Sequence, residues 1–397
     1  MRYTLTITAV LLNILLAGCT PRPGVDQATL VSTPSLKNQT TSPANMDTPT
    51  AHNTPIDVNS NPPPSAASTA TAAQESSSTP RPESELDSQS GITGTKWLTF
   101  GPWEQVTTLS WSTDGNLLAV AAGESIYIYE TDTLTELGQL NSGVWTGSLA
   151  FGNEGRQLAS GHNDGYLRLW SLETYSPTME IEAHKRGASS VAYRPQGDSL
   201  ASGGKDAVAR LWDSVSGEKI AEFIGGTYAV PGLAFSPDGE RLAILNGDTI
   251  RLREVSSGRF SFSIFGEGTY YSVAIDPQGE RLAAGNTNNG IDIWDIHHKP
   301  GTPRETYEPQ LKLAGHSGKA NSYQALVWTL AFSPDGRIPA SGGGDHSVRL
   351  WDPLNGALLQ LLEGHSNVVT SLAFHPDGIR LASGSLDGTV FVWELSH

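Results

Sequence analysis

The sequence predicts an all-β repeat fold, and three observations lead to this prediction. Short hairpin turns recur through the last three quarters of the chain, each turn lies between two strand-like runs, and the spacing between turns is nearly constant. From glycine to glycine most steps are about 40 to 42 residues, with one of about 57 before the sixth turn, and such a period is typical of propellers and solenoids. The seven turns are Asp114-Gly115, Glu154-Gly155, Gln196-Gly197, Asp238-Gly239, Gln278-Gly279, Asp335-Gly336 and Asp377-Gly378.

The last unit shows how each hairpin is encoded. Two short apolar runs, which begin at Leu372 and at Leu381, flank the segment Pro376-Asp377-Gly378. Proline and aspartate favour the start of a tight turn, and glycine accepts the positive φ that a hairpin turn needs. Each of the seven units is therefore expected to contain at least one β-hairpin.

Three units carry further residues at matching positions. The last unit opens with a Gly-His pair at His365, continues through Ser383 and Asp387, and closes with Trp393. This pattern resembles the WD-repeat family, whose repeats open with Gly-His, close with Trp-Asp and form four-stranded blades. The resemblance covers about residues 97 to 397 and implies a seven-bladed β-propeller.

The same resemblance implies a structural role for these polar residues. In the family, matching residues form a hydrogen-bonded chain in which Trp bonds Ser, Ser bonds His and His bonds Asp, and such a buried chain is stabilising when every member is satisfied. Repetition in three units argues against a catalytic triad, because an enzyme needs only one site. The three full sets are His184, Ser202, Asp206 and Trp212; His316, Ser341, Asp345 and Trp351; and His365, Ser383, Asp387 and Trp393.

Four units depart from this pattern. Blade two has Ser160, Asp164 and Trp170 but lacks the histidine. Blades one, four and five carry other residues at the Trp, Ser or Asp positions, so we expect them to rely on apolar packing alone. These residues are Tyr129 in blade one, Arg253 in blade four, and Ala284 with Asn288 in blade five.

The two ends of the repeat region are expected to share the last blade. Only four residues follow Trp393, which leaves no room for a fourth strand in the seventh unit. Alignment of the first turn with the last places Trp97–Phe100 where other units have their outer strand. We predict that Trp97–Phe100 pairs with Val390–Trp393, because an open ring would leave a sheet edge unpaired and blade faces in water.

Residues 1–18 resemble a bacterial lipoprotein signal peptide. A positive start at Arg2 precedes an apolar run of about 13 residues, Leu5–Ala17, which is shorter than the roughly 20 residues that a membrane-spanning helix needs. The run ends in Leu-Ala-Gly-Cys, so Cys19 is the expected site of acylation. An ordinary secretory signal with an accidental cysteine is the alternative. The lipoprotein interpretation places the protein on the bacterial cell envelope, at the outer face of the cytoplasmic membrane or the periplasmic side.

A linker is expected between the acylated cysteine and the propeller. The segment from Thr20 to Lys96 contains no Phe, Trp or Tyr and is dominated by Thr, Ser, Pro, Ala and Asn. Such a composition lacks the apolar surface to offset chain entropy, and it predicts disorder. The expected organisation is therefore a signal peptide over residues 1–18, acylated Cys19 with a disordered linker over 19–93, and the propeller over 94–397.

Composition limits the classes of function. The net charge is −16, whereas nucleic-acid binders usually have a basic patch, so no nucleic-acid partner is expected. Cys19 is the only cysteine, which excludes a disulfide framework. No sequence pattern indicates a cofactor or a metal site. The adjacent pair His297-His298 lies in a long polar insertion and predicts a solvated loop.

Large residues in the loops that lead into the first strands predict a binding rim. In the family geometry these loops share one rim with the turns that carry Asp206, Asp345 and Asp387. Aromatic residues are frequent at binding hot spots. Tyr271 and Trp328 lie within the strands themselves and are the two most expected in the core. The predicted partner-binding residues are Trp103, Gln105, Trp145, Tyr228, Tyr271, Tyr323 and Trp328.

Two insertions, residues 297–310 and 317–324, account for the longer spacing and are expected on opposite rims. Together these features predict a lipid-anchored, non-enzymatic scaffold or binding module, a monomeric propeller that contacts unknown protein partners through one rim. Two alternatives stay open. One is a propeller hydrolase or lyase with a site in the central channel, and the other is a glycan or small-molecule receptor that uses the aromatic rim.

Overall fold

A computed structural model describes residues 93–101, 104–133, 135–152, 155–224, 226–297, 308–318 and 323–395. The predicted signal peptide, Cys19 and the predicted linker up to residue 92 lie outside the described residues. Among the residues described, no helix has the length and apolar character needed to cross a membrane.

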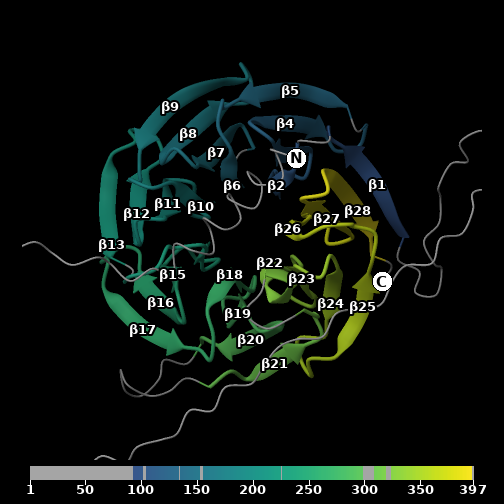
Figure 1. Cartoon of the computed structure of the whole chain (residues 1–397). Helices are drawn as coiled ribbons and strands as arrows, with labels where there is room; N and C mark the ends of the chain where they lie inside the picture. The colour runs from purple at the N-terminus through teal and green to yellow at the C-terminus, as the bar shows by residue number, and fades with distance from the viewer. Residues whose placement is uncertain are drawn as a thin grey trace, which may run out of the picture. The chain divides into compact units, whose positions relative to one another are not determined.

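The described residues form seven four-stranded antiparallel sheets arranged around a common centre (Figure 1), and the predicted seven-bladed β-propeller is confirmed. Blades one to three contain β2 (Val106–Trp111), β3 (Leu117–Ala122), β4 (Ser125–Glu130) and β5 (Glu136–Asn141); β6 (Thr146–Phe151), β7 (Gln157–His162), β8 (Tyr166–Ser171) and β9 (Ser176–Glu182); β10 (Ala188–Tyr193), β11 (Ser199–Gly204), β12 (Val208–Asp213) and β13 (Lys219–Ile224).

Blades four to seven continue the same order along the chain. They contain β14 (Leu233–Phe235), β15 (Arg241–Asn246), β16 (Thr249–Glu254) and β17 (Phe260–Phe265); β18 (Tyr270–Ile275), β19 (Arg281–Asn286), β20 (Gly290–Asp295) and β21 (Leu311–Ala314); β22 (Val327–Phe332), β23 (Pro339–Gly343), β24 (Val348–Trp351) and β25 (Leu358–Leu362); β26 (Val369–Phe374), β27 (Arg380–Ser385), β28 (Thr389–Glu394) and β1 (Thr93–Thr99). A short 3₁₀ helix, η1 (Tyr323–Ala325), precedes β22.

The turn between the first two strands of a blade follows from its Asp-Gly chemistry. In blade six the Ser333 hydroxyl donates a hydrogen bond to Asp335 Oδ1 over 2.6 Å, and the backbone N–H of Arg337 donates to the same oxygen over 3.0 Å. Gly336 has a φ of 74°, a conformation that glycine adopts without steric cost. The side chain of aspartate thus replaces backbone partners in the turn, and glycine permits the reversal.

The core lies between neighbouring blades. One cluster of buried residues combines Leu245 and Phe262 from blade four with Leu282 and Trp294 from blade five. Burial of each large apolar side chain contributes about 1.5–3 kcal/mol. A blade hides its apolar faces only against its neighbours, so stability depends on completing the ring.

The N-terminal strand completes the last blade, as predicted. β1 pairs antiparallel with β28, from Thr93 opposite Glu394 to Thr99 opposite Thr389. The strand begins four residues before the predicted Trp97, and its register shifts between Lys96 and Leu98. The predicted pairing is therefore corrected: Trp393, Val392, Phe391 and Val390 lie opposite Gly94, Thr95, Lys96 and Leu98, Trp97 lies at the bulge, and Phe100 follows the end of the strand.

Candidate interaction rim

Each sheet is an antiparallel meander, so its connections alternate between two rims. We call lead-in rim the one formed by the loops that enter each first strand and by the turns between the second and third strands. Backbone hydrogen bonds join these two kinds of segment: the Asn163 N–H donates to the Trp145 carbonyl over 3.1 Å, and the Gly344 N–H to the Leu326 carbonyl over 2.9 Å. The Asp-Gly turns and the connections from third to fourth strand form the opposite rim.

Three blades contain the full polar chain in their interior. In blade seven the Trp393 Nε1–H donates to Ser383 Oγ over 2.9 Å, and this oxygen lies 2.7 Å from His365 Nε2. His365 Nδ1 lies 3.3 Å from Asp387 Oδ2. In blades three and six the Trp–Ser, Ser–His and His–Asp distances all lie between 2.7 and 2.9 Å. The Trp, Ser and His members are buried.

In blades three and six, electrostatics favours a neutral histidine beside an ionised aspartate, because the pKa values of both groups are lowered. Burial lowers the pKa of His316, although Asp345 acts in the opposite direction. Burial would raise the pKa of Asp345, but hydrogen bonds from His316, the Ser317 N–H and Arg349 hold it well below its usual range. The serine hydroxyl has partners on both sides, which suits a network that joins strands within a blade.

Blade two contains a histidine that the sequence analysis did not assign to it. His162 Nε2 lies 2.6 Å from Ser160 Oγ, and the Trp170 Nε1–H donates to the same oxygen over 2.7 Å. His162 is two residues after the serine on β7, where blades three and six have Gly204 and Gly343 and a loop histidine fills the space. Burial lowers the pKa of His162 to about 4. The loop histidine is absent from blade two, as expected, but a histidine of β7 takes its place beside the serine.

The expectation that blade five relies on apolar packing alone was also wrong. The hydroxyl of buried Tyr270 donates to Asp292, and Asn286 Nδ2 donates to the same carboxylate over 3.4 Å. The Tyr270 ring packs edge-on against Trp294, with centroids 5.7 Å apart. Blade four likewise bonds Asn246 to the Tyr228 carbonyl. Blades four and five thus contain buried polar groups at positions other than those of the repeat pattern. Comparison with the repeat pattern therefore does not identify these groups.

The structure separates the predicted rim residues into groups. Tyr228 and Tyr323 are 42% and 46% exposed, and Trp103 lies outside the described residues. The others are half-buried. Tyr271 and Trp328 were expected in the core because they lie within strands, and this expectation is corrected. The half-buried residues are Gln105, Trp145, Tyr271 and Trp328.

Bulges explain why Tyr271 and Trp328 are accessible. Each lies at a register shift near the start of its strand, β18 or β22, and a bulge changes the direction of a side chain. In blades one and seven the residues at this position are Thr107 and Thr370, whose hydroxyls donate to the next blade over 2.7 and 2.8 Å. Blades five and six have aromatic rings at this place instead.

Tyr271, Tyr323 and Trp328 form what we call the aromatic cluster. The rings of Tyr271 and Trp328 come from adjacent blades and lie with centroids 6.1 Å apart at 47°. The Trp328 Nε1–H donates to the Tyr323 carbonyl over 3.2 Å, which ties the ring to η1. η1 in turn lies against Gly344, where an added Cβ would meet the Tyr323 carbonyl. The cluster is thus held by strands on two blades and by one insertion.

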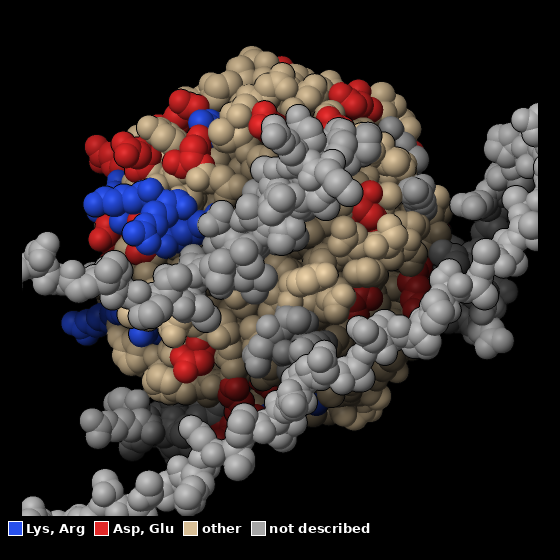
Figure 2. Space-filling view, viewed as in Figure 1, with Lys and Arg blue, Asp and Glu red and all other residues tan. Residues whose placement is uncertain are grey.

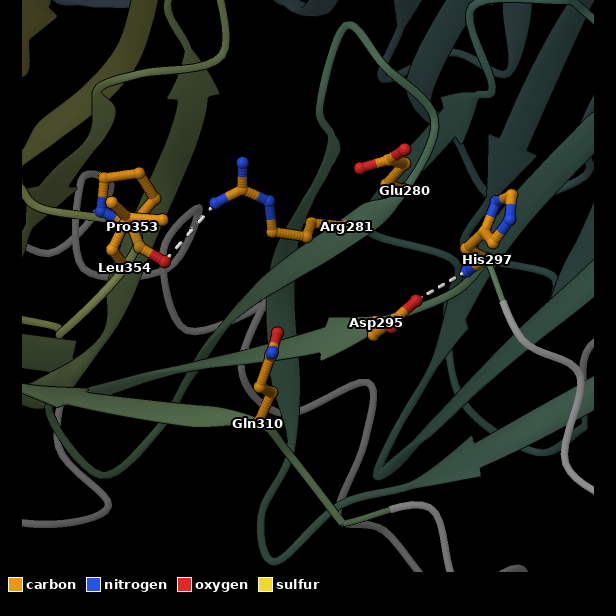
Figure 3. Close-up of a pocket in the computed structure, with 7 residues that line it drawn as sticks. All are labelled: Glu280, Arg281, Asp295, His297, Gln310, Pro353 and Leu354. Carbon is orange, nitrogen blue, oxygen red and sulfur yellow. Dashed lines mark hydrogen bonds between the residues drawn. The ribbon is translucent and has the colours of Figure 1, made fainter.

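The opposite rim contains a hollow of about 350 Å³ between blades five and six (Figure 3). Arg281 Nη1 donates to the Pro353 carbonyl over 3.3 Å, and the His297 N–H to Asp295 Oδ1 over 2.8 Å. The described ends of the first predicted insertion, His297 and Gln310, line this hollow, whereas residues 298–307 lie outside the described residues. Among the described residues, no group of three or more His, Cys, Asp or Glu side chains could hold a metal ion.

Comparison with protein families matches four segments of the chain. The model of the WD domain, G-beta repeat, matches residues 134–171, 175–213, 307–352 and 356–394. Each segment runs from the outer strand of one blade to the third strand of the next. The four matched repeats are those whose serine accepts a hydrogen bond from a tryptophan and lies beside a histidine. The tryptophans are Trp170, Trp212, Trp351 and Trp393.

Similar proteins include the Notchless protein homolog of Arabidopsis thaliana, 34% identical over 86 residues, which are 22% of this chain and 15% of that protein. WD repeat-containing protein 18 of Homo sapiens is 32% identical over 104 residues, 26% of this chain and 23% of that protein. The chromatin assembly factor 1 subunit FAS2 homolog of Oryza sativa subsp. japonica is 34% identical over 93 residues, 23% and 17%. The chain thus spans less than a quarter of these relatives. The matched repeats, together with the seven-bladed fold, support a WD-repeat family for this protein.

Proposed function

We propose that the protein is a non-enzymatic binding module that contacts a protein partner through the lead-in rim, with the aromatic cluster at the centre of the contact. The observation that carries this proposal is the replacement of blade-bridging hydroxyls by the rings of Tyr271 and Trp328. Aromatic side chains bury a large area at small entropic cost and dominate many protein interfaces. One relative is by name a homolog of a chromatin assembly factor 1 subunit, which agrees with a role in binding other proteins.

The rim is suited to recognition because it presents loops on a rigid scaffold. The exposed ring of Tyr323 and the half-buried rings beside it lie next to one another on blades five and six. Gln105 and Trp145 are on blades one and two and would contact only a partner that covers much of the rim. Tyr228 lies in the lead-in loop of blade four, between these groups in chain order.

Capture of proteins from a cell-envelope extract tests the proposal. The full chain is compared with a Tyr323→Ala, Trp328→Ala variant, which should lose at least tenfold in affinity for a captured protein, or about 1.4 kcal/mol. Val215→Ala is the matched control, because Val215 is 84% exposed on the opposite rim. Unchanged thermal unfolding of the variant shows that the fold is intact. Retention of every captured protein by the double variant would contradict the proposal.

We further propose that Cys19 is acylated and holds the module at the bacterial cell envelope. Support comes from the sequence alone, from the apolar run that ends in Leu-Ala-Gly-Cys. Each acyl methylene contributes about 0.8 kcal/mol of membrane binding, and two or more chains give stable anchoring. The full chain should sediment with membranes, and Cys19→Ser should shift it to the soluble fraction. An unchanged distribution, or an unmodified mass at Cys19, would contradict the anchor.

A further inference from the structure

Four third strands carry an arginine two residues before the position of the repeat tryptophan: Arg168, Arg210, Arg251 and Arg349. In blades two, three and six this arginine pairs with the aspartate of the preceding turn. The distances are 2.8 Å for Arg168–Asp164, 2.8 Å for Arg210–Asp206 and 2.7 Å for Arg349–Asp345.

Two of these arginines also have a second carboxylate on the neighbouring outer strand. Arg168 Nε lies 2.8 Å from Glu180, and Arg210 Nε lies 3.0 Å from Glu222. In both cases the glutamate is the direct cross-strand partner of the arginine. The guanidinium group thus lies between a turn carboxylate and a strand carboxylate, an arrangement that its planar set of donors fits.

Blade four keeps the arginine and lacks both acids. The turn before β16 has Gly247 followed by Asp248, and Asp248 Oδ1 accepts a bond from Thr249. The direct cross-strand partner of Arg251 is Ser263, in the register of Glu180 and Glu222. Within the described residues, Arg251 Nη1 is buried and has no hydrogen-bond partner. Arg168 Nη1 and Arg349 Nε are also buried without a partner in the described residues, but another nitrogen of each of those side chains pairs with a carboxylate. Arg251 differs because no ion pair with a described carboxylate compensates its unsatisfied nitrogen.

Further unpaired groups lie on the same part of blade four. Arg253 Nε is buried without a hydrogen-bond partner in the described residues, as is Ser261 Oγ. The Arg253 guanidinium lies over the rings of Phe223 and Phe260, 5.7 and 5.5 Å from their centroids. Burial and the charge of Arg251 lower the pKa of Arg253. Two positive charges therefore lie close together, and within the described part of the chain neither forms an ion pair with a carboxylate, in a protein of net charge −16.

Arg251 lies close to the loop that leads into blade four. A Cβ built on Gly226, in the lead-in loop of blade four, would lie 3.6 Å from Arg251 Nη1. The ring of Tyr228 packs on Gly247, in the turn that holds the aspartate in other blades. Arg251 as a whole is only half-buried. Lys and Arg side chains also gather over blade three, the neighbour of blade four, on the face seen in Figure 2.

We propose that Arg251, supported by Arg253, binds an oxyanion, a carboxylate or phosphate group, which takes the role that the turn aspartate has in blades two, three and six. The inference deepens the proposed function, because an acidic group of the partner that contacts Tyr228 would reach this site. The inference predicts that the partner presents a negative charge at blade four. Binding of a small anion tests this prediction without the partner.

Thermal unfolding of the full chain in sodium acetate, sodium phosphate and sodium chloride at equal ionic strength is the test. The wild type should show a saturable rise in unfolding temperature with acetate or phosphate beyond that in chloride. Arg251→Gln should weaken this response at least tenfold. Arg259→Gln is the matched control, since Arg259 is exposed on the same blade and its replacement should leave the response unchanged. The anion that saturates at the lower concentration identifies the carboxylate or the phosphate as the preferred group.

Ser263→Glu is a second variant that does not depend on removing the arginine. It restores the cross-strand pair of blades two and three, so it should raise the unfolding temperature in chloride and abolish the response to acetate and phosphate. The proposal is overturned if the wild type responds no more than Arg251→Gln, or if Ser263→Glu keeps the full response. Failure of partner capture by the aromatic-cluster variant tests the proposed function separately, because no partner is present in the anion titration.

Discussion

Single residues decide whether a blade keeps its polar interior. In blade three Gly204 leaves room for the loop residue His184, because a Cβ at that position would clash with the imidazole. In blade two His162 occupies the same position of the second strand and reaches Ser160 from there. The serine and the tryptophan stay, and the histidine comes from a different part of the blade. The histidine therefore keeps its contact with the serine although its place in the chain differs.

Removal of the central serine should show how much the hydrogen-bonded network stabilises the fold. Ser383→Ala leaves His365 Nε2 and the Trp393 Nε1–H without their partner in a buried site. Each unsatisfied group costs about 1–3 kcal/mol, so the urea midpoint of the full chain should fall clearly. Ser256→Ala, at an exposed position, is the control and should change stability by less than about 0.5 kcal/mol. Equal midpoints for the two variants would show that the network does not stabilise the blade.

The buried imidazole of blade two should make stability depend on pH. Burial lowers the pKa of His162 from 6.5 to about 4, so the unfolded chain takes up the proton first as the pH falls. The stabilisation is present above pH 6.5 and is lost as the pH falls toward 4, by about 3 kcal/mol at most. His162→Asn, which copies Asn246 and Asn286 at the matching positions, should reduce the difference between urea midpoints at pH 7.5 and pH 4.5. An unchanged difference would mean that His162 is not buried as a neutral group.

At the scale of strands, the turns could be predicted from the sequence, whereas the strand irregularities could not. The seven Asp-Gly-like turns predicted seven blades, because a positive φ and a reversal of the chain depend on local residues. The bulge at Tyr271 and Trp328 recurs at the same place in blades one, two, three and seven, where unlike residues occupy it, so no residue pattern marks it in the sequence. For the same reason the exposure of these two rings was not predicted. That Arg251 has neither acidic partner could be recognised only from the strand register, which places Ser263 opposite it.

Closure of the last blade by β1 can be tested by truncation. Trp97, Leu98 and Phe100 pack on a cluster that joins blades seven and one, and β1 covers the edge of β28. A chain that begins at Gly101 should unfold on the order of 10 °C below one that begins at Glu85, which keeps the strand. Differential scanning calorimetry gives both midpoints. Coincident midpoints would refute the closure as a source of stability.

At the scale of the whole propeller, the two rims differ in what they present. The lead-in rim carries the aromatic cluster on blades five and six and the unpaired guanidinium of Arg251 on blade four. The opposite rim carries the Asp-Gly turns and the hollow lined by Glu280 and Arg281. A partner that combines an apolar segment with an acidic group matches the first arrangement.

The central claim is that the lead-in rim over blades four to six is the contact surface. Hydrogen–deuterium exchange of the full chain, alone and bound to a captured protein, locates that surface. Exchange should slow in residues 226–230, 266–270 and 323–328, and it should stay unchanged in the opposite-rim turns at residues 213–219 and 352–358. Slower exchange confined to the opposite-rim turns, with the lead-in loops unaffected, would contradict the account.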